Sequence, residues 1–163
     1  MKQKHNLGSY ILVAISLLLF ACGTTQTAAE KADKAKHLRE KIESFNFKFN
    51  ATYAHPQNYK SVYLSSYYDV KVSPDTVKAY LPFFGRAYTA PMNSREGGIK
   101  FESTDFEYII EEGKKDGRWQ ITINTKDTPS PFMLYFDLWD NGTALLSVHD
   151  RNRQSISFQG TVE

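Results

Sequence analysis

From residue 45 to the C-terminus, apolar and polar residues alternate with a period of two. Successive side chains of a β-strand point to opposite faces, so this alternation predicts strands with one buried face. The first such run has Phe45, Phe47, Phe49, Ala51 and Tyr53 at alternate positions. The same alternation recurs at 68–72, 106–111, 119–123, 132–138, 144–148 and 156–158, and shorter strands are expected at 62–65 and 76–81.

The segments between these runs are short and rich in turn-forming residues. Ser73-Pro74-Asp75 and the glycine-flanked stretch 113–117 are typical turns, and residues 55–58 are expected to break the first strand. Asp140-Asn141-Gly142 predicts a type I′ hairpin. Connections this short favour antiparallel pairing of about eight to ten strands. The sequence therefore predicts a mainly β fold, either an antiparallel meander or a half-barrel, with one N-terminal helix.

The predicted helix covers residues 28–44, where alanine is frequent and neither proline nor glycine occurs. Glu30–Lys34 and Arg39–Glu43 have the i,i+4 spacing of helical ion pairs. An apolar stripe along the helix predicts packing against the sheet, and a spacer or partner helix is the alternative. The stripe consists of Ala28, Ala32, Ala35, Leu38, Ile42 and Phe45.

The N-terminus has the pattern of an export signal. Lys2 and Lys4 precede an apolar run at 10–20, which is shorter than the ~20 residues that span a membrane. The sequence 19–22, Leu-Phe-Ala-Cys, resembles the lipobox of bacterial lipoproteins, which implies cleavage after residue 21 and lipidation of Cys22. An ordinary signal peptide with an incidental cysteine, or an uncleaved anchor, is the alternative.

On this basis, residues 1–21 form the signal peptide, 22–27 a lipidated tether, 28–44 the helix and 45–163 a β-rich domain. Gly23 is not the aspartate that marks inner-membrane retention in some bacteria, which favours the outer membrane, on its periplasmic side or at the cell surface.

Charge and cysteine content argue against several classes of protein. Without Lys2 and Lys4, the chain has 18 basic and 18 acidic side chains, a balance that argues against nucleic-acid binding. A single cysteine excludes an intramolecular disulfide and a cysteine metal cluster. His37, His55 and His149 lack metal-ligand spacing, and nucleophile-elbow and phosphate-loop motifs are absent from the sequence. We therefore expect a protein without a metal or cofactor that is not an enzyme.

The segment 80–88 does not alternate and places aromatic residues between proline and glycine. Its candidate binding residues are Tyr80, Phe83, Phe84, Arg86 and Tyr88. An arginine among aromatic rings can stack on them and still bind a carboxylate. Arg86 is therefore either an internal clasp, with Asp105 or Glu107 as partner, or a contact for a ligand or a partner protein.

Three stretches resemble one known family, the Bacteroidetes-type lipoproteins that carry domain of unknown function 4251. They are YLPFFGRAY at 80–88, GGIKFESTDFEY at 97–108 and NGTALLSVHDRNRQSISFQG at 141–160. The resemblance implies a β-rich lipoprotein of the cell envelope and no known activity. Asp75-Thr76-Val77 also resembles the O-glycosylation triplet of such envelopes, with Thr76 as acceptor.

These observations predict a membrane-anchored, non-enzymatic envelope lipoprotein that acts as a protein-interaction module. The alternative is a carrier of a small apolar ligand or lipid in a β-cup. A carrier needs an internal apolar pocket of several hundred Å³, whereas an interaction module needs a filled core and an exposed patch.

Overall fold

The computed structural model describes residues 27–88, 97–113 and 117–163. The predicted signal peptide, Cys22 and most of the tether lie outside these ranges. The described chain is mainly antiparallel β-sheet with one helix, which confirms the predicted fold class. No helix within these ranges is both long and apolar enough to cross a membrane.

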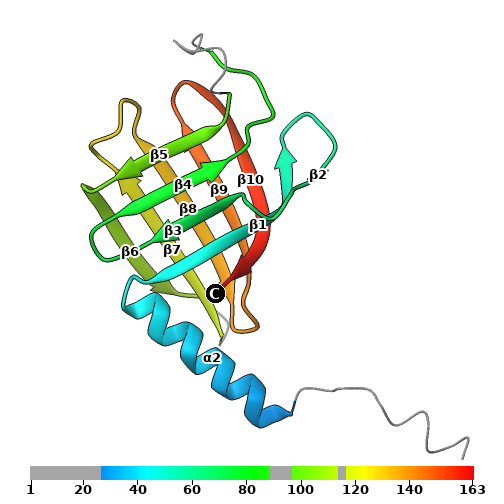
Figure 1. Cartoon of the computed structure of the whole chain (residues 1–163), viewed down its shortest axis with the longest axis vertical. Coiled ribbons are helices and arrows are strands. Elements are labelled where there is room, and N and C mark those ends of the chain that lie inside the picture. The colour runs from blue at the N-terminus through cyan, green and yellow to red at the C-terminus, as the bar shows by residue number, and fades with distance from the viewer. Residues whose placement is uncertain (1–26, 89–96, 114–116) are drawn as a thin grey trace, which may run out of the picture.

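One helix precedes ten strands in the described chain (Figure 1). The helix is α2 (Ala28–Glu43), and the strands are β1 (Phe47–Pro56), β2 (Val62–Tyr63), β3 (Asp69–Val72), β4 (Val77–Leu81), β5 (Ile99–Ser103), β6 (Phe106–Glu112), β7 (Arg118–Thr125), β8 (Phe132–Trp139), β9 (Thr143–Asp150) and β10 (Arg153–Val162).

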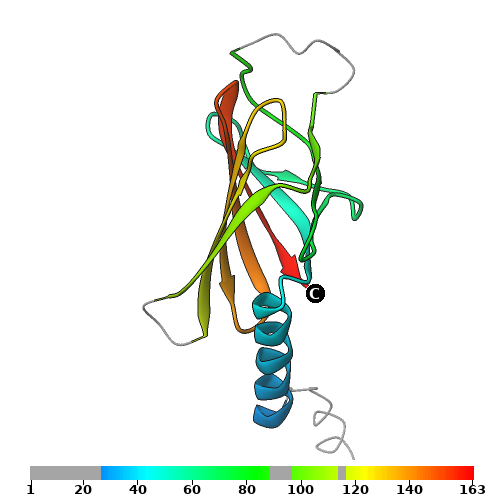
Figure 2. The same ribbon diagram turned by 90° about the vertical axis from the view of Figure 1, so that its left-hand side faces the viewer.

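All strands belong to one sheet with the order β5-β4-β3-β1-β10-β9-β8-β7-β6, and β2 pairs with β1 beside β3. The sheet folds over so that β1, β3, β4 and β5 form one layer and β6 to β9 the other (Figures 1 and 2). Its edge strands, β5 and β6, follow each other in the chain and are joined only by Thr104 and Asp105. The sheet is therefore a nearly closed barrel.

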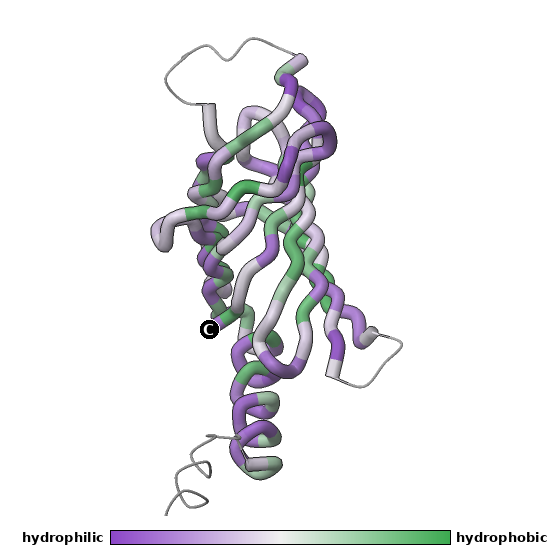
Figure 3. The backbone as a smooth tube through the Cα atoms, turned by 90° about the vertical axis from the view of Figure 1, so that its right-hand side faces the viewer, coloured by the Kyte–Doolittle hydropathy of each residue, from purple (hydrophilic) through white to green (hydrophobic). Residues whose placement is uncertain are grey.

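Aromatic side chains from opposite layers meet inside the barrel. The Phe136 ring of β8 lies 5.7 Å, centroid to centroid, from the rings of both Phe47 and Phe49 of β1. Phe101 of β5 stacks on Phe132 of β8 at 4.6 Å. Hydrophobic segments recur along the strands of the barrel, whereas the helix below it is mostly hydrophilic (Figure 3). The inward residues of the alternating runs therefore form the core.

The first strand differs from its prediction at both ends. Phe45 has φ 51°, a left-handed conformation that turns the chain out of the helix, so β1 begins two residues later at Phe47. The strand then continues through His55 to Pro56, where a break was expected. Pro56 is the last residue of the strand, a position that tolerates the missing backbone donor.

The hairpin between β8 and β9 forms where it was predicted, but not as a type I′ turn. That turn needs positive φ at both central residues. Here Gly142 is left-handed, at φ 83°, and Asn141 is not. The Gly142 N–H donates to the carbonyl of Trp139 at 2.9 Å. The geometry is that of a type I turn followed by a left-handed glycine.

The helix combines both predicted roles. Leu38 and Ile42 are buried under the barrel, whereas Ala28 and Ala32 are exposed and the N-terminal half projects beyond the sheet (Figure 2). The packing prediction is therefore wrong for this half, because its stripe offers only alanine methyl groups.

Of the two predicted helical ion pairs, Arg39–Glu43 forms, with 2.8 Å between Nε and Oε1. The Glu30 carboxylate instead accepts the backbone N–H of Thr27 in a capping box, so the predicted Glu30–Lys34 pair is wrong.

Candidate binding surface

Five tyrosines lie along β1 and β4 and on the segment between them, and we call them the tyrosine surface. They are Tyr53, Tyr63, Tyr67, Tyr68 and Tyr80. Tyr63 and Tyr67 are the most exposed, at 72% and 64%. Rings of Tyr53 and Tyr63 pack edge to face at 5.3 Å, and those of Tyr67 and Tyr68 lie 5.4 Å apart. Aromatic rings of this size, left in solvent, are typical of binding surfaces.

The segment that carries these rings is held by the barrel. Leu64 is buried in the core, and its N–H donates to the Thr52 carbonyl of β1 at 2.9 Å. The Tyr68 carbonyl accepts the N–H of Ala51 at 2.9 Å. His55 and Ser61 are joined by a 2.7 Å hydrogen bond between Nδ1 and Oγ. The rings are therefore presented on an ordered backbone, which lowers the entropy lost on binding.

Tyr80 is the one residue of the predicted 80–88 site that joins this surface. It points outward from β4, and its ring stacks on Tyr68 at 5.5 Å with an interplanar angle of 13°. The Lys100 ammonium of β5 lies 4.8 Å from the centroid of the Tyr80 ring. This cation–π contact adds a positive charge to the border of the tyrosine surface.

Phe83 and Phe84 are half-buried and pack against the core instead. The guanidinium carbon of Arg153 lies 5.1 Å from the Phe83 ring centroid. The Nε of Arg153 donates to Asp150 at 2.8 Å, and one terminal nitrogen donates to the Gly98 carbonyl at 3.2 Å. Arg153 therefore makes the internal clasp that the sequence suggested for Arg86.

Arg86 and Tyr88 are exposed on either side of Ala87, which pairs with Arg153 at the start of β10. The start of β10 lies at the end of the barrel opposite α2 (Figure 1). The contacts of Arg86 and Tyr88 are made by the backbone: the Arg86 N–H donates to the Gln154 side chain at 2.9 Å, and the Tyr88 N–H donates to the Asn152 carbonyl at 2.7 Å. The predicted 80–88 site is thus divided among the tyrosine surface, the core and this end of the barrel.

Of the two predicted carboxylate partners of Arg86, Glu107 pairs with another residue. Glu107 pairs with the Lys126 ammonium at 2.9 Å, and this hydrogen bond and charge lower the pKa of Glu107. The backbone carbonyl of Asp105 accepts the N–H of Lys126. Within the described ranges, the Arg86 guanidinium has no ion pair, so the predicted clasp to Asp105 or Glu107 is wrong.

Metal-ligating side chains do not gather in the described part of the chain. No group of three or more histidine, cysteine, aspartate or glutamate side chains there has the arrangement to hold an ion. His37 is on α2, His55 is next to the tyrosine surface, and His149 bonds Ser155 through Nδ1 at 3.0 Å.

The most exposed members of the tyrosine surface were not among the predicted site residues. Tyr63 and Tyr67 belong to the segment 58–69, NYKSVYLSSYYD, which has four tyrosines and three serines. Tyrosine and serine also dominate antibody paratopes, where rigid rings supply contact area and hydroxyls supply adaptable hydrogen bonds. This local composition was the signal that could have identified the surface.

Comparison with known proteins places the chain in a family. The family model described as Domain of unknown function (DUF4251) matches residues 29–162, which include every described strand and all of the helix except its first residue. The chain belongs to the DUF4251 family. This confirms the resemblance inferred from the sequence.

A DUF4251 protein of known structure has the same fold. The crystal structure of a DUF4251 family protein from Bacteroides eggerthii DSM 20697 matches with a TM-score of 0.61 at 11% sequence identity. The match covers 83% of this chain and 91% of that chain. A search of curated proteins finds no match.

Proposed function

We propose that this DUF4251 protein is an envelope lipoprotein, anchored through a lipid on Cys22, whose β domain is a non-enzymatic module that binds a protein partner through the tyrosine surface. The observation that carries the proposal is the set of five tyrosines, packed in a pair and a group of three, of which Tyr63 and Tyr67 are about two-thirds exposed. Interface energy depends on a few large residues, and tyrosine is among the commonest of them.

The arrangement of α2 supports an anchored role. The helix begins at Ala28, six residues after Cys22, and its 16 residues extend about 24 Å at 1.5 Å per residue. Its N-terminal half stands clear of the barrel, and the tyrosine surface lies on the strands beyond its C-terminal end (Figure 1). A lipid on Cys22 would attach the protein to the membrane on the side of the helix N-terminus. The tyrosine surface, beyond the other end of the helix, would stay accessible.

The packed interior favours an interaction module over the alternative, a carrier of an apolar ligand. Phe49, Phe136 and Phe158 are among the largest fully buried side chains, and rings from both layers touch across the barrel. A ligand of drug-like size needs a pocket of about 300 Å³ or more. Such a ligand would have to displace these rings.

Photo-crosslinking in intact cells tests the proposal. We would introduce a benzophenone amino acid at Tyr63 or Tyr67, and at Tyr135 as the control. Tyr135 is 40% exposed on the outer face of β8, in the other layer of the barrel. We expect a discrete adduct with a protein partner from positions 63 and 67 and none from 135.

A second measurement links the adduct to the tyrosines themselves. We expect Y63S combined with Y67S to lower recovery of the partner by at least tenfold, and Y135S to leave it unchanged, with equal amounts of folded protein. Adducts of equal yield at all three positions would refute the proposed surface. An acyl chain that co-purifies with the domain in native mass spectrometry would favour the carrier.

A further inference from the structure

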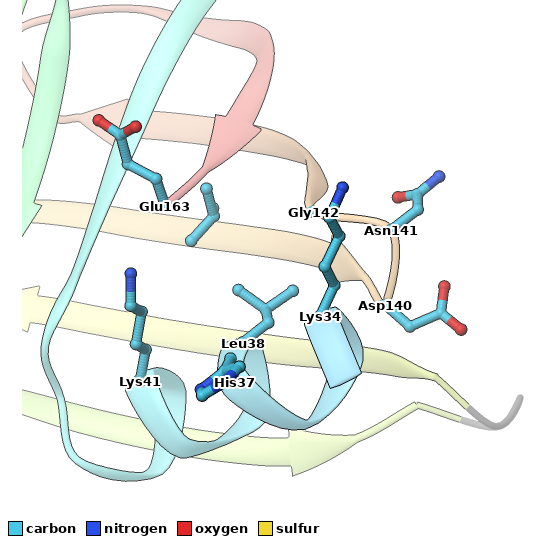
Figure 4. A pocket seen from close by; sticks show the side chains of 9 residues that line it. Lys34, His37, Leu38, Lys41, Asp140, Asn141, Gly142 and Glu163 are labelled. Atoms are coloured by element: carbon cyan, nitrogen blue, oxygen red, sulfur yellow. The ribbon is translucent and has the colours of Figure 1, made fainter. Parts of the chain in front are cut away.

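Two hollows meet where α2 joins the barrel, and both are lined by lysine side chains. The first, of about 200 Å³, lies between α2 and the β8–β9 turn and includes Lys34 and Lys41 (Figure 4). The second, of about 250 Å³, lies beside β1 and β3 and includes Lys41, Lys48 and Lys71. Since Lys41 lines both hollows, we call the pair the lysine crevice.

The lysines of the crevice are only partly neutralised. Lys48 lies 3.4 Å from Asp69, ammonium to carboxylate. Within the described ranges, Lys34, Lys41 and Lys71 form no ion pair. Three lysines from three elements therefore surround the second hollow, and two of them have no carboxylate within contact distance.

Two carboxylates border the crevice, and one of them, Glu163, lines both hollows. Glu163 accepts the Asn50 side-chain amide at 2.8 Å and lies 3.7 Å from the Lys48 ammonium. Figure 4 shows the carboxylates of Asp140 and Glu163 pointing away from Leu38, which forms part of the floor. Asp69 and Glu163 therefore offset the Lys48 charge. A negatively charged group in the second hollow would be attracted mainly by Lys41 and Lys71, which form no ion pair within the described ranges.

The strand register places lysines directly opposite one another, where their like charges repel. Lys48 and Lys71 are directly opposite each other on β1 and β3, and Lys71 is directly opposite Lys78 on β4. Like charges at directly opposed positions destabilise a sheet. Lys78 is paired with Glu102 at 2.9 Å and Lys48 with Asp69 at 3.4 Å, whereas Lys71, between them, has no ion pair within the described ranges. A bound anion would supply the opposite charge that Lys71 lacks.

We propose that the lysine crevice binds a phosphate group, with Lys41, Lys48 and Lys71 as its cationic partners and the Ser73 hydroxyl and Asn46 amide as its neutral ones. Both neutral side chains line the second hollow. A phosphate suits this set because it carries more than one charged oxygen and accepts several hydrogen bonds at once. It could belong to a lipid headgroup or to a soluble phosphate ester.

The test uses the chain from residue 22 onward with Cys22→Ser, which contains every residue the structure describes. One arm measures co-sedimentation with vesicles of phosphatidylglycerol and phosphatidylcholine in equal parts. The other arm measures chemical-shift changes on titration with glycerol 3-phosphate. The crevice variant is K41Q combined with K71Q. The control is K36Q combined with K60Q, which removes the same charge from exposed lysines outside both hollows.

We expect binding in at least one arm, weakened roughly thirtyfold in the crevice variant and little changed in the control. Binding in the vesicle arm alone identifies a headgroup as the source, and binding in both arms identifies the phosphate ester itself. Absence of binding in both arms, or equal loss in both double variants, would overturn the proposal. K71Q alone, at an exposed position, serves as the second variant if the double variant loses its near-ultraviolet circular dichroism.

Discussion

At the scale of single residues, Gly160 shows how closely two strands of the barrel approach. It lies in β10 opposite Ala51, where the pairing with β1 shifts register. A Cβ atom at this position would lie 2.1 Å from the Asn50 carbonyl oxygen and 2.8 Å from the Phe49 ring. Neither neighbour is free to move, because one is backbone and the other a fully buried ring.

We therefore expect Gly160→Ala to destabilise the fold by about 1–3 kcal/mol, the usual cost of overpacking. The matched control is Gly97→Ala, where a Cβ atom would meet nothing within 4 Å. That substitution should change stability by less than about 0.5 kcal/mol. Urea unfolding followed by tryptophan fluorescence measures both, and equal stabilities of the two variants would contradict the prediction.

At the scale of elements, one carboxylate organises the turn that joins the two edge strands. Asp127, after β7, accepts hydrogen bonds from the Ser103 hydroxyl and from the backbone N–H groups of Thr104 and Asp105, the last two at 2.8 and 3.2 Å. These bonds favour the ionised form and lower the pKa of Asp127 from 3.8 to about 2.

Because the pKa is lowered on folding, the Asp127 contribution is present above pH 4 and is lost as the pH falls from about 4 to about 2. We expect Asp127→Asn to lower the melting temperature at pH 7. The difference from the wild type should shrink as the pH approaches 2. Thermal unfolding across this pH range measures it, and a difference that stays constant from pH 7 to pH 2 would show that ionisation of Asp127 is not involved.

The two halves of α2 differ in what they contribute to stability. Ile42 is fully buried, and the Tyr108 hydroxyl of β6 donates to its carbonyl at 3.3 Å, whereas Ala32 is exposed on the projecting half. Burial also raises the pKa of Tyr108, so this hydroxyl keeps its proton. The C-terminal half is therefore part of the barrel core and the N-terminal half is a spacer.

Ile42→Ala should accordingly cost about 2–5 kcal/mol. Ala32→Gln should change stability by less than about 0.5 kcal/mol, because it alters only the exposed half. Chemical denaturation of the two variants measures the difference. A large loss from Ala32→Gln would mean that the N-terminal half also packs against the protein.

At the scale of the whole molecule, the proposal treats the lipid anchor and the folded domain as separate units joined by the predicted tether. Several acyl chains, at ~0.8 kcal/mol per buried CH₂, would make membrane attachment effectively stable. We expect Cys22→Ser to abolish incorporation of labelled palmitate and to leave the protein uncleaved or soluble, with its melting temperature unchanged. An unmodified thiol at Cys22, or an N-terminus elsewhere in the wild-type protein, would contradict the lipoprotein assignment.

The sequence by itself determined the fold class and most of the secondary structure. Most of the longer strands carry their own period-two pattern, and α2 is rich in alanine, so neighbouring residues were sufficient to predict these elements. The exception is β5 (Ile99–Ser103), which was not predicted. Where the structure departs from the predicted elements, the difference lies in the connections between them. The left-handed Phe45 delays β1, and Gly142 alone takes the left-handed position in the turn, because the connection had to fit the strands on either side.

Only the tertiary structure decided how the sheet closes and which side chains share a surface. Strand register brings Tyr80 to Tyr68 and Lys71 to Lys48, and the folding of the sheet brings Arg153 to Phe83, a contact of the kind expected of Arg86. These pairs are separated by 12, 23 and 70 positions along the chain. The alternation of apolar and polar residues predicts which face of the sheet a side chain lies on, but not which strand lies beside it. For that reason the binding surface could not be predicted from the sequence pattern alone.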